Sequence, residues 1–350
     1  MAKGSKKEGG GIGELLAYAG DRKFLTYLGM ALSAFSQLLS FGPYVCIWLV
    51  ARDLIAVAPN WSEATDIAMY GWWAVGFALV SIVIYFVGLM CTHLSAFRCA
   101  SNIRKATSEH LLKLPLGYFD THATGELRRI VDGCAASTET LLAHMLPDIA
   151  GATAMVAGLL VLLFALDWRL GVACLISVAV SLGAMATMMS GKGAEFMKAY
   201  MGALVKMNKT GTEYVRGIPV VKVFQQTVYS FKAFHDAIAE YADMAQNYAG
   251  TFCRGPQVLN LTALNGLVAF LLPVALLLAP GETDFAHFMV NFTFYAIFSA
   301  VVPTAMTKLM FVGEASQMSA DSLARIRSVM DSKQLSVPAQ PKHPAGSDVR

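Results

Sequence analysis

The stretch IAMYGWWAVGFALVSIVIYFVGLMCTHLSAF, residues 67–97, holds 31 residues without a single Asp, Glu, Lys or Arg. A helix needs roughly 20 mostly apolar residues to cross the hydrocarbon core of a bilayer, so this stretch is long enough to span a membrane. Six such charge-free runs stand apart, whereas the next longest, residues 244–253, has only 10 residues. The sequence therefore predicts an all-α membrane protein with six transmembrane helices. The six runs are residues 24–51, 67–97, 149–166, 170–191, 255–281 and 285–307.

The composition agrees with a lipid bilayer as the surrounding solvent. Of the residues, 56% are hydrophobic and 15% are charged, whereas soluble domains carry about 25% charged residues. The net charge is only +3, and no Lys/Arg cluster with interleaved aromatic residues stands out, so nucleic acid is not an expected partner. The six cysteines are scattered without a CxxC pair, which favours reduced packing residues over a disulfide framework or a metal site.

The basic residues predict the orientation of the helices. Cytoplasmic loops close to membrane helices carry an excess of Lys and Arg. With the amino terminus inside, the external loops are residues 52–66, 167–169 and 282–284, and they hold only Arg52 and Arg169 of the 27 basic residues. The sequence therefore predicts a multi-pass protein of the cell (cytoplasmic) membrane with both termini in the cytosol.

The loops differ strongly in length. The external loops have 15, 3 and 3 residues, whereas the internal loops, residues 98–148 and 192–254, have 51 and 63. The internal loops are rich in helix formers and carry apolar residues at helical spacing. We therefore expect two long helical hairpins that extend the membrane helices into the cytosol.

Each hairpin has a punctuated tip. In the first, Pro115 ends the descending helix, Asp120 is expected to cap a short helix over residues 121–124, and Gly125 ends that helix. In the second, Gly217 and Pro219 are followed by the polar residues 225–227 before the helical pattern resumes, and this tip is less sharply punctuated. The first tip therefore predicts a short helix that crosses the end of its hairpin.

Four segments, in this order and at these loop positions, resemble the transmembrane domain of ABC transporters with the exporter-type fold, also called type IV. The resemblance covers residues 12 to about 331. The segments are Leu114 and Pro115 through Tyr118, Phe119 and Asp120 to Gly125, Glu126 and Leu127; Asp132; Asp167, Trp168, Arg169 and Leu170; and EYVRGIPVVKVF, residues 213–224.

The resemblance implies that the two hairpin tips, residues 118–125 and about 225–231, are coupling helices that press on a nucleotide-binding domain. It also implies a second transmembrane half, identical or different, so that two six-helix units form one alternating-access pathway. The expected domains are a cytosolic N-terminus with an elbow helix (residues 1–23), the transmembrane domain (24–331) and a linker or tail (332–350). The expected coupling residues are Tyr118, Phe119, Asp120, Thr121, His122, Gln225, Gln226, Thr227 and Tyr229.

No GxxxxGK[ST] phosphate-binding loop occurs in the sequence, and that loop is the part that holds phosphate and magnesium in its class of ATPases. The resemblance therefore implies that ATP and Mg²⁺ bind to a partner nucleotide-binding domain and that this chain carries no cofactor and no catalytic motif. In the family, such a domain begins near residue 332. We expect either a truncated membrane half or a natural membrane subunit with a separate ATPase.

Polar side chains inside the runs are costly unless they face protein, water or ligand. They are candidates for the substrate pathway, and hydrogen bonding between helices is their alternative role. Pro43, Pro273 and Pro303 lie well inside runs, where a missing backbone donor favours a kink. His93 has no His or Cys at i+3 or i+4, so we expect no metal site there. The pathway candidates are Gln37, Gln257, Asn260, Asn265, Asn291 and Thr304.

The function that the resemblance implies is ATP-driven transport, with export of a small molecule, lipid or peptide as the first expectation. Import of a siderophore or another solute by the same fold is the alternative. A proton-driven peptide uptake protein of this fold would need titratable groups in its cavity, and no carboxylate lies inside any of the six runs. A membrane receptor or scaffold would leave the capped hairpin tips without a purpose.

Overall fold

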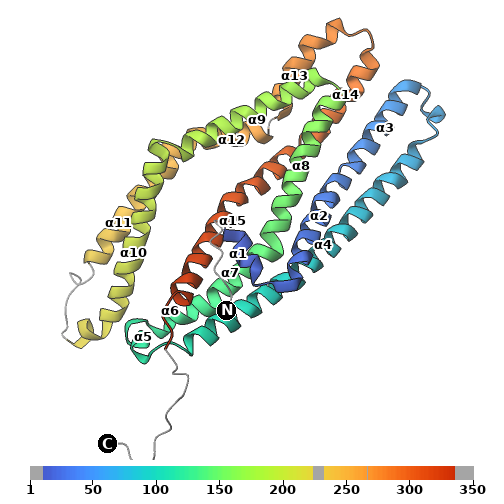
Figure 1. Ribbon diagram of the computed structural model, residues 1–350. Helices are drawn as coiled ribbons and strands as arrows, with labels where there is room; N and C mark the ends of the chain where they lie inside the picture. The colour runs from blue at the N-terminus through green and yellow to red at the C-terminus, as the bar shows by residue number, and fades with distance from the viewer. Residues whose placement is uncertain (1–10, 224–231, 266, 336–350) are drawn as a thin grey trace, which may run out of the picture. The chain divides into compact units, whose positions relative to one another are not determined.

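The computed structural model describes residues 11–223, 232–265 and 267–335, and all regular secondary structure in these ranges is helical (Figure 1). This confirms the all-α fold class. The chain forms two compact units, one of Met1–Val161 with Thr304–Arg350 and the other of Leu162–Pro303. Below, the first unit and the second unit refer to these two parts.

Five helices in the described ranges are long and apolar enough to cross a membrane. Two further helices, Lys232–Asn265 and Phe270–Gly281, meet at a bend of 49°. They form a sixth span if the two are counted together as one. Pro273 lies inside the second helix of this pair, α13 (Leu267–Leu278). Because proline removes a backbone donor, a bend in this part of the chain is expected.

The first unit begins with the short helix α1 (Gly11–Ala17) and two consecutive helices, α2 (Lys23–Leu39) and α3 (Gly42–Val57). The charge-free run 24–51 is thus split, and Pro43 lies in the first turn of α3, where its missing N–H costs nothing. Helix α4 (Ile67–Leu111) then runs for 45 residues, about 68 Å at 1.5 Å per residue. That length is more than twice the hydrocarbon thickness of about 30 Å.

The first hairpin turns through α5 (Leu116–Thr121) and returns through α6 (Thr124–Arg128). The returning leg continues as one helix over Thr124–Ala165. It contains two π-helical turns, η3 (Arg129–Gly133) and η4 (Leu141–Met145), on either side of α7 (Cys134–Thr140), and it ends as α8 (Leu146–Ala165). The predicted first hairpin is therefore present.

One detail of the first tip was predicted wrongly. The short helix starts directly after Pro115, whose extended backbone (ψ 148°) forms the N-cap, and it ends at Thr121. Asp120 consequently lies in the last turn of α5 and does not cap a helix over residues 121–124. Gly125 lies inside α6 and does not end the short helix.

In the second unit, α9 (Trp168–Met189) is followed by the 32-residue helix α10 (Lys192–Val223). The two meet at Gly191, whose φ of 53° is a left-handed conformation that glycine adopts readily. Helix α10 continues through Pro219 to Val223, so the proline does not end the leg. The expected second tip, residues 225–231, falls almost entirely within residues 224–231, which lie outside the described residues.

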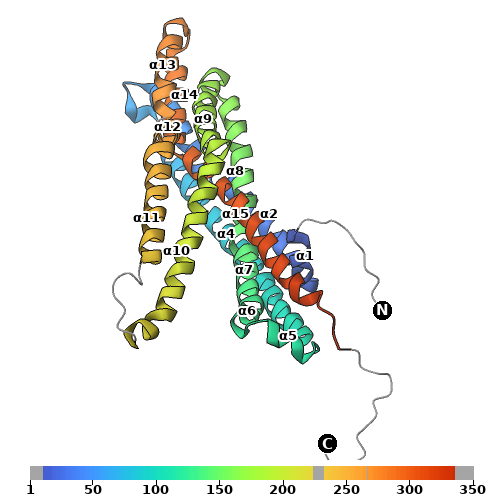
Figure 2. The same cartoon turned by 90° about the vertical axis from the view of Figure 1, so that its left-hand side faces the viewer.

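The returning leg of the second hairpin consists of α11 (Lys232–Gln246), the π-helical segment η6 (Asn247–Cys253) and α12 (Arg254–Asn265). Helices α10 and α11 lie side by side in both ribbon views (Figures 1 and 2). After α13 and the 3₁₀ turn η7 (Ala279–Gly281), α14 (Phe285–Phe298) completes the second unit, and α15 (Val301–Met330) leads back into the first.

Small residues let α2 and α4 approach each other closely. A Cβ atom at Gly29 would lie 2.6 Å from the carbonyl oxygen of Gly88 on the facing helix. The Thr26 hydroxyl donates to Ser95 Oγ at 2.7 Å, and Ser36 donates to the carbonyl of Ser81 at 2.9 Å. Small residues and hydroxyl bonds of this kind stabilise helix pairs in a bilayer, where the hydrophobic effect between helices is weak.

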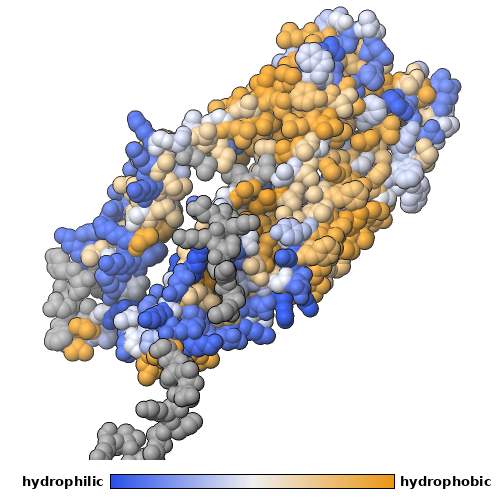
Figure 3. All heavy atoms as spheres, viewed as in Figure 1, coloured by the Kyte–Doolittle hydropathy of each residue, from blue (hydrophilic) through white to orange (hydrophobic). Residues whose placement is uncertain are grey.

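A hydrophobic core joins α1 to helices α4 and α15 in the first unit. Leu15 and Leu16 are buried in one cluster with Cys99 and Ile103 of α4 and with Ile326 of α15. The apolar face of the expected elbow helix is therefore covered by protein. On the face in Figure 3, hydrophobic residues cover much of the length of α2 and α4, and hydrophilic residues gather near the end that carries α5 and α6.

Candidate functional site

The tip of the first hairpin is held in shape by its own side chains. The rings of Tyr118 and His122 stack at 4.0 Å between centroids, with an interplanar angle of 13°. The Nδ1 atom of His122 lies 2.9 Å from the carbonyl oxygen of Tyr118, and the Thr121 hydroxyl donates to the same oxygen at 3.0 Å. These contacts fix α5 although it has only six residues.

The tip also exposes large apolar side chains. Leu112 and Leu116 are each 85% exposed, and Phe119 is 41% exposed. A predicted coupling residue, Asp120, is exposed beside them. We call Leu112, Leu116 and Phe119 the tip surface. A cluster of exposed apolar residues, next to exposed polar ones, is typical of a site that binds another protein.

Ion pairs connect the two legs of the first hairpin near its tip. Asp132 on η3 lies 3.6 Å from Arg104 of α4 and 3.8 Å from Arg128 of its own leg. The two legs are thus linked across the hairpin by an exposed ion pair, which contributes little stability on its own. Asp132, which belongs to the motif quoted from the sequence, has a structural role at this position.

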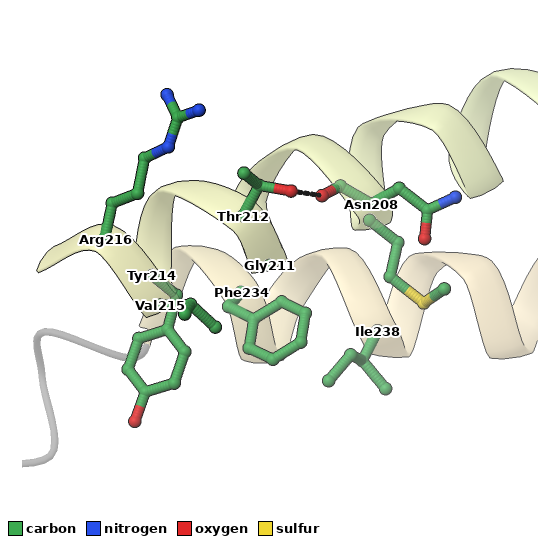
Figure 4. Close-up of a pocket in the computed structure, with 9 residues that line it drawn as sticks. Asn208, Gly211, Thr212, Tyr214, Val215, Arg216, Phe234 and Ile238 are labelled. Carbon is green, nitrogen blue, oxygen red and sulfur yellow. Dashed lines mark hydrogen bonds between the residues drawn. The ribbon is translucent and has the colours of Figure 1, made fainter. Parts of the chain in front are cut away.

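The second hairpin carries a pocket of about 830 Å³ between α10 and α11 (Figure 4). Phe234 stacks on Tyr214 at 5.7 Å between ring centroids. A Cβ at residue 211 would lie 3.0 Å from Phe234, so Gly211 allows this close packing. Met207 and Ile238 also line the pocket.

Sequence reasoning missed this pocket. The signal available in the sequence is the helical spacing of Met207, Gly211 and Tyr214 on one leg and of Phe234 and Ile238 on the other. The predicted coupling residues of this hairpin fall in the segment outside the described residues. They are Gln225, Gln226, Thr227 and Tyr229.

The polar pathway candidates of the second unit have different environments. Asn260 on α12 is buried, and its Oδ1 accepts a hydrogen bond of 3.4 Å from Ser181 of α9. Gln257, one turn before it, is exposed. Asn265 is exposed as well, and its amide donates to the carbonyl of Leu261 in its own helix. Asn260 thus forms a hydrogen bond between two helices, which is the alternative role that the sequence analysis gave for such residues. The side chain of Gln257 remains exposed.

The two candidates of the first unit are also unlike each other. Gln37 is half-buried between α2 and α8, because a Cβ at Gly151 would lie only 2.9 Å from its Cγ. Thr304, near the start of α15, is exposed.

The ring of His93 packs against the ring of His144, with 4.7 Å between their centroids. His144 lies on another helix, so the search for partners three or four residues along the same helix could not find it.

A tight polar cluster, the turn cluster, forms where α8 meets α9 and where η7 meets α14. Arg169 pairs with Asp167 at 3.0 Å and with Glu282 of the other turn. The hydroxyl of Tyr295 on α14 lies 2.8 Å from the carbonyl oxygen of Asp167 and 2.5 Å from that of Leu163. The cluster ties two turns that are 113 residues apart in the chain.

Asp167 is both a helix cap and an ion-pair partner. Its side chain accepts a hydrogen bond from the backbone N–H of Arg169 at 2.9 Å and so caps α9. Burial favours its protonated form, but the hydrogen bonds and the positive charge of Arg169 outweigh burial and hold the pKa of Asp167 below its ordinary value. Asn291, a pathway candidate, is buried and lines a pocket of about 470 Å³ beside this cluster.

These features define a class: a multi-pass helical membrane protein whose helices extend into long hairpins, with exposed apolar side chains at the described tip. The family described as ABC transporter transmembrane region matches residues 26–302. The chain belongs to this family, which confirms the resemblance seen in the sequence.

Three curated relatives are similar to the chain over part of their length. The mycobactin import ATP-binding/permease protein IrtA of Mycobacterium tuberculosis is 27% identical over 205 residues, which is 59% of this chain and 23% of that protein. IrtA of Mycolicibacterium smegmatis is 25% identical over 69% of this chain and 27% of its own length. IrtA of Mycolicibacterium thermoresistibile is 25% identical over 70% and 26%. The chain thus matches about a quarter of each relative.

Proposed function

We propose that this chain forms one half of the translocation pathway of an ABC transporter that imports a siderophore. The observation that carries the direction and the cargo is that all three relatives are named for the import of mycobactin, a siderophore. The sequence alone favours export first and siderophore import second. The relatives support the second reading.

The energy for this import comes from a nucleotide-binding domain, either continuous with this chain or separate from it. The relatives are named as ATP-binding proteins as well as permeases, whereas this chain has no GxxxxGK[ST] loop. ATP and Mg²⁺ therefore bind to a nucleotide-binding domain that docks on the hairpin tips, and the tip surface supplies the apolar contact area for that docking. A second transmembrane half, identical or different, completes the pathway.

The orientation follows from the charges. Because only Arg52 and Arg169 of the 27 basic residues fall in the predicted external loops, the hairpins lie in the cytosol of a cell whose cytoplasmic membrane holds the protein. The turn cluster of Asp167, Arg169 and Glu282 then lies at the external face.

Of the pathway candidates, Gln257 is the best placed to meet cargo, because it is exposed on α12 one turn from the buried Asn260. Asn260 holds α12 against α9, because its Oδ1 accepts a hydrogen bond of 3.4 Å from the Ser181 hydroxyl. We assign contact with cargo to Gln257 and a packing role to Asn260.

ATP hydrolysis by the assembled transporter in nanodiscs tests the cargo class. We expect iron-loaded mycobactin to stimulate hydrolysis at least threefold, and iron-free mycobactin to stimulate it less. Equal stimulation by an unrelated amphipathic solute of the same size, or no stimulation by iron-loaded mycobactin, would refute siderophore import.

A Gln257→Leu variant separates cargo contact from assembly. It should raise the siderophore concentration needed for half-maximal stimulation and leave basal hydrolysis unchanged. Thr262→Val is the matched control, because Thr262 is an exposed polar residue of the same helix.

A further inference from the structure

The segment that follows α15 contacts the end of α4 and the link after it. The backbone N–H of Leu335 donates to the carbonyl oxygen of Lys113 at 2.8 Å. The carbonyl oxygen of Ser332 lies 3.0 Å from Nε2 of His110, and the side-chain amide of Gln334 lies 2.8 Å from Nδ1 of the same ring. Both nitrogens of one histidine are thus used to hold a single short segment.

The chemistry of these partners defines the proton on His110. A carbonyl oxygen can only accept a hydrogen bond, so Nε2 donates to Ser332. In the neutral ring, Nδ1 is then an acceptor, and the N–H of Gln334 donates to it. His110 is buried, with 9% of its surface exposed. A buried ring with both nitrogens satisfied is a specific attachment point and not an incidental surface contact.

The attachment lies immediately before the first tip. His110 occupies the penultimate position of α4, and Lys113 lies in the non-helical link between α4 and α5. The end of α15 also contacts α1. Ile326 belongs to the core with Leu15, and Arg327 forms an ion pair with Glu14 of α1. The end of α15 is therefore fixed to α1 on one side and to the link before α5 on the other.

We infer that His110 is a positioning residue: it fastens the segment Ser332 to Leu335 to the base of the first tip, so that α15 and α5 move as one body. We call the contacts of His110 and Lys113 with this segment the clasp. The inference rests on the proposed function, because its purpose is to transmit the movement of the docked ATPase domain from α5 to α15. It adds a route of coupling that passes from the last turn of α4 and the link after it directly to the segment that follows α15.

The clasp also enlarges the apolar surface at the tip. Leu335 is 58% exposed, and its backbone is bonded to the link that carries Leu112 and Lys113. The clasp thereby holds Leu335 close to the tip surface. A partner that docks on α5 then meets side chains from both ends of the first unit.

Hydrogen–deuterium exchange on the assembled transporter tests the clasp itself. The Leu335 amide should exchange at least tenfold faster in His110→Ala than in the unmodified protein. His144→Ala replaces an exposed histidine of the same unit that does not contact the segment, and it should leave the Leu335 amide protected. Unchanged exchange of Leu335 in His110→Ala would overturn the inference.

Coupling provides the second readout, measured as siderophore transported per ATP hydrolysed. His110→Ala should lower this ratio at least threefold. His110→Gln should restore at least half of it, since the glutamine amide can reach the position of Nε2 and donate to Ser332. A ratio in His110→Ala equal to that in His144→Ala would contradict the positioning role.

Gln334→Ala keeps the test decisive if His110→Ala does not assemble, because Gln334 is exposed and its loss removes only the bond to Nδ1. It should speed exchange of the Leu335 amide, and unchanged exchange would refute the clasp.

The proposed function and the clasp can be refuted separately. A transporter that ignores siderophores but shows protected Leu335 refutes the proposed function alone, and siderophore import with fast Leu335 exchange refutes the clasp alone.

Discussion

Replacement of Phe119 by alanine should weaken the docking of the ATPase domain by a predictable amount. Phe119 is 41% exposed, which for a phenylalanine that buries about 200 Å² corresponds to about 80 Å² of free surface. At about 25 cal/mol per Å², complete burial of that surface contributes about 2 kcal/mol. Since 1.4 kcal/mol is tenfold in affinity, the loss corresponds to roughly 30-fold.

The assay is titration of the membrane domain in nanodiscs with its separately purified ATPase domain, followed by fluorescence anisotropy. Phe24→Ala is the matched control, because Phe24 is 63% exposed but belongs to α2. It should leave the dissociation constant within threefold of the original value. A change of less than threefold in Phe119→Ala, or an equal loss in the control, would show that α5 is not the docking site.

Three further predictions concern the stability of the membrane domain in detergent, measured by thermal unfolding. Gly29→Leu should destabilise it by about 1 to 3 kcal/mol, because a Cβ there would lie 2.6 Å from the Gly88 carbonyl; unchanged stability would mean that α2 and α4 are farther apart. Tyr295→Phe should cost about 1 to 3 kcal/mol, since it removes the hydroxyl that bonds the carbonyls of Leu163 and Asp167; a neutral result would remove this tyrosine from the turn cluster. Asp167→Asn should lower stability at neutral pH. The pKa of Asp167 is below its ordinary value in the folded protein, so its contribution is present above about pH 4 and is lost as the pH falls further; a deficit that persists in acid would exclude the ion pair as its cause.

Much of the fold could be predicted because the bilayer imposes it. In lipid every backbone polar group must be paired within the protein, and a charge-free run of about 20 residues achieves this within itself as a helix. Each of the six runs lies largely in helical segments. The unequal loops predicted the hairpins for a similar reason, since apolar residues at helical spacing must pack against a second helix. The ends of the elements were less predictable.

The error at the first tip has a local cause. Asp120 has the chemistry of an N-cap, but Pro115 already provides an extended residue with a fixed φ, and α5 starts directly after it. The backbone restriction of this proline therefore decides where the short helix begins.

The site residues show where sequence reasoning stops. The exposed aromatic residue at the tip, Phe119, follows from its place beside a proline break. The pairing of Arg169 with Glu282 and the clasp of His110 on Ser332 depend on segments 113 and 222 residues apart. No periodicity within one helix contains that information.

The most direct test of siderophore import is the direction of ATP-driven movement. Proteoliposomes are prepared with the transporter oriented so that its ATPase domains face outward, loaded with iron-charged mycobactin and supplied with external ATP and Mg²⁺. We predict that the siderophore leaves the lumen toward the ATPase side, and that a catalytically inactive ATPase domain abolishes this movement. ATP-dependent accumulation of added siderophore in the lumen, away from the ATPase domains, would contradict the account and identify the transporter as an exporter.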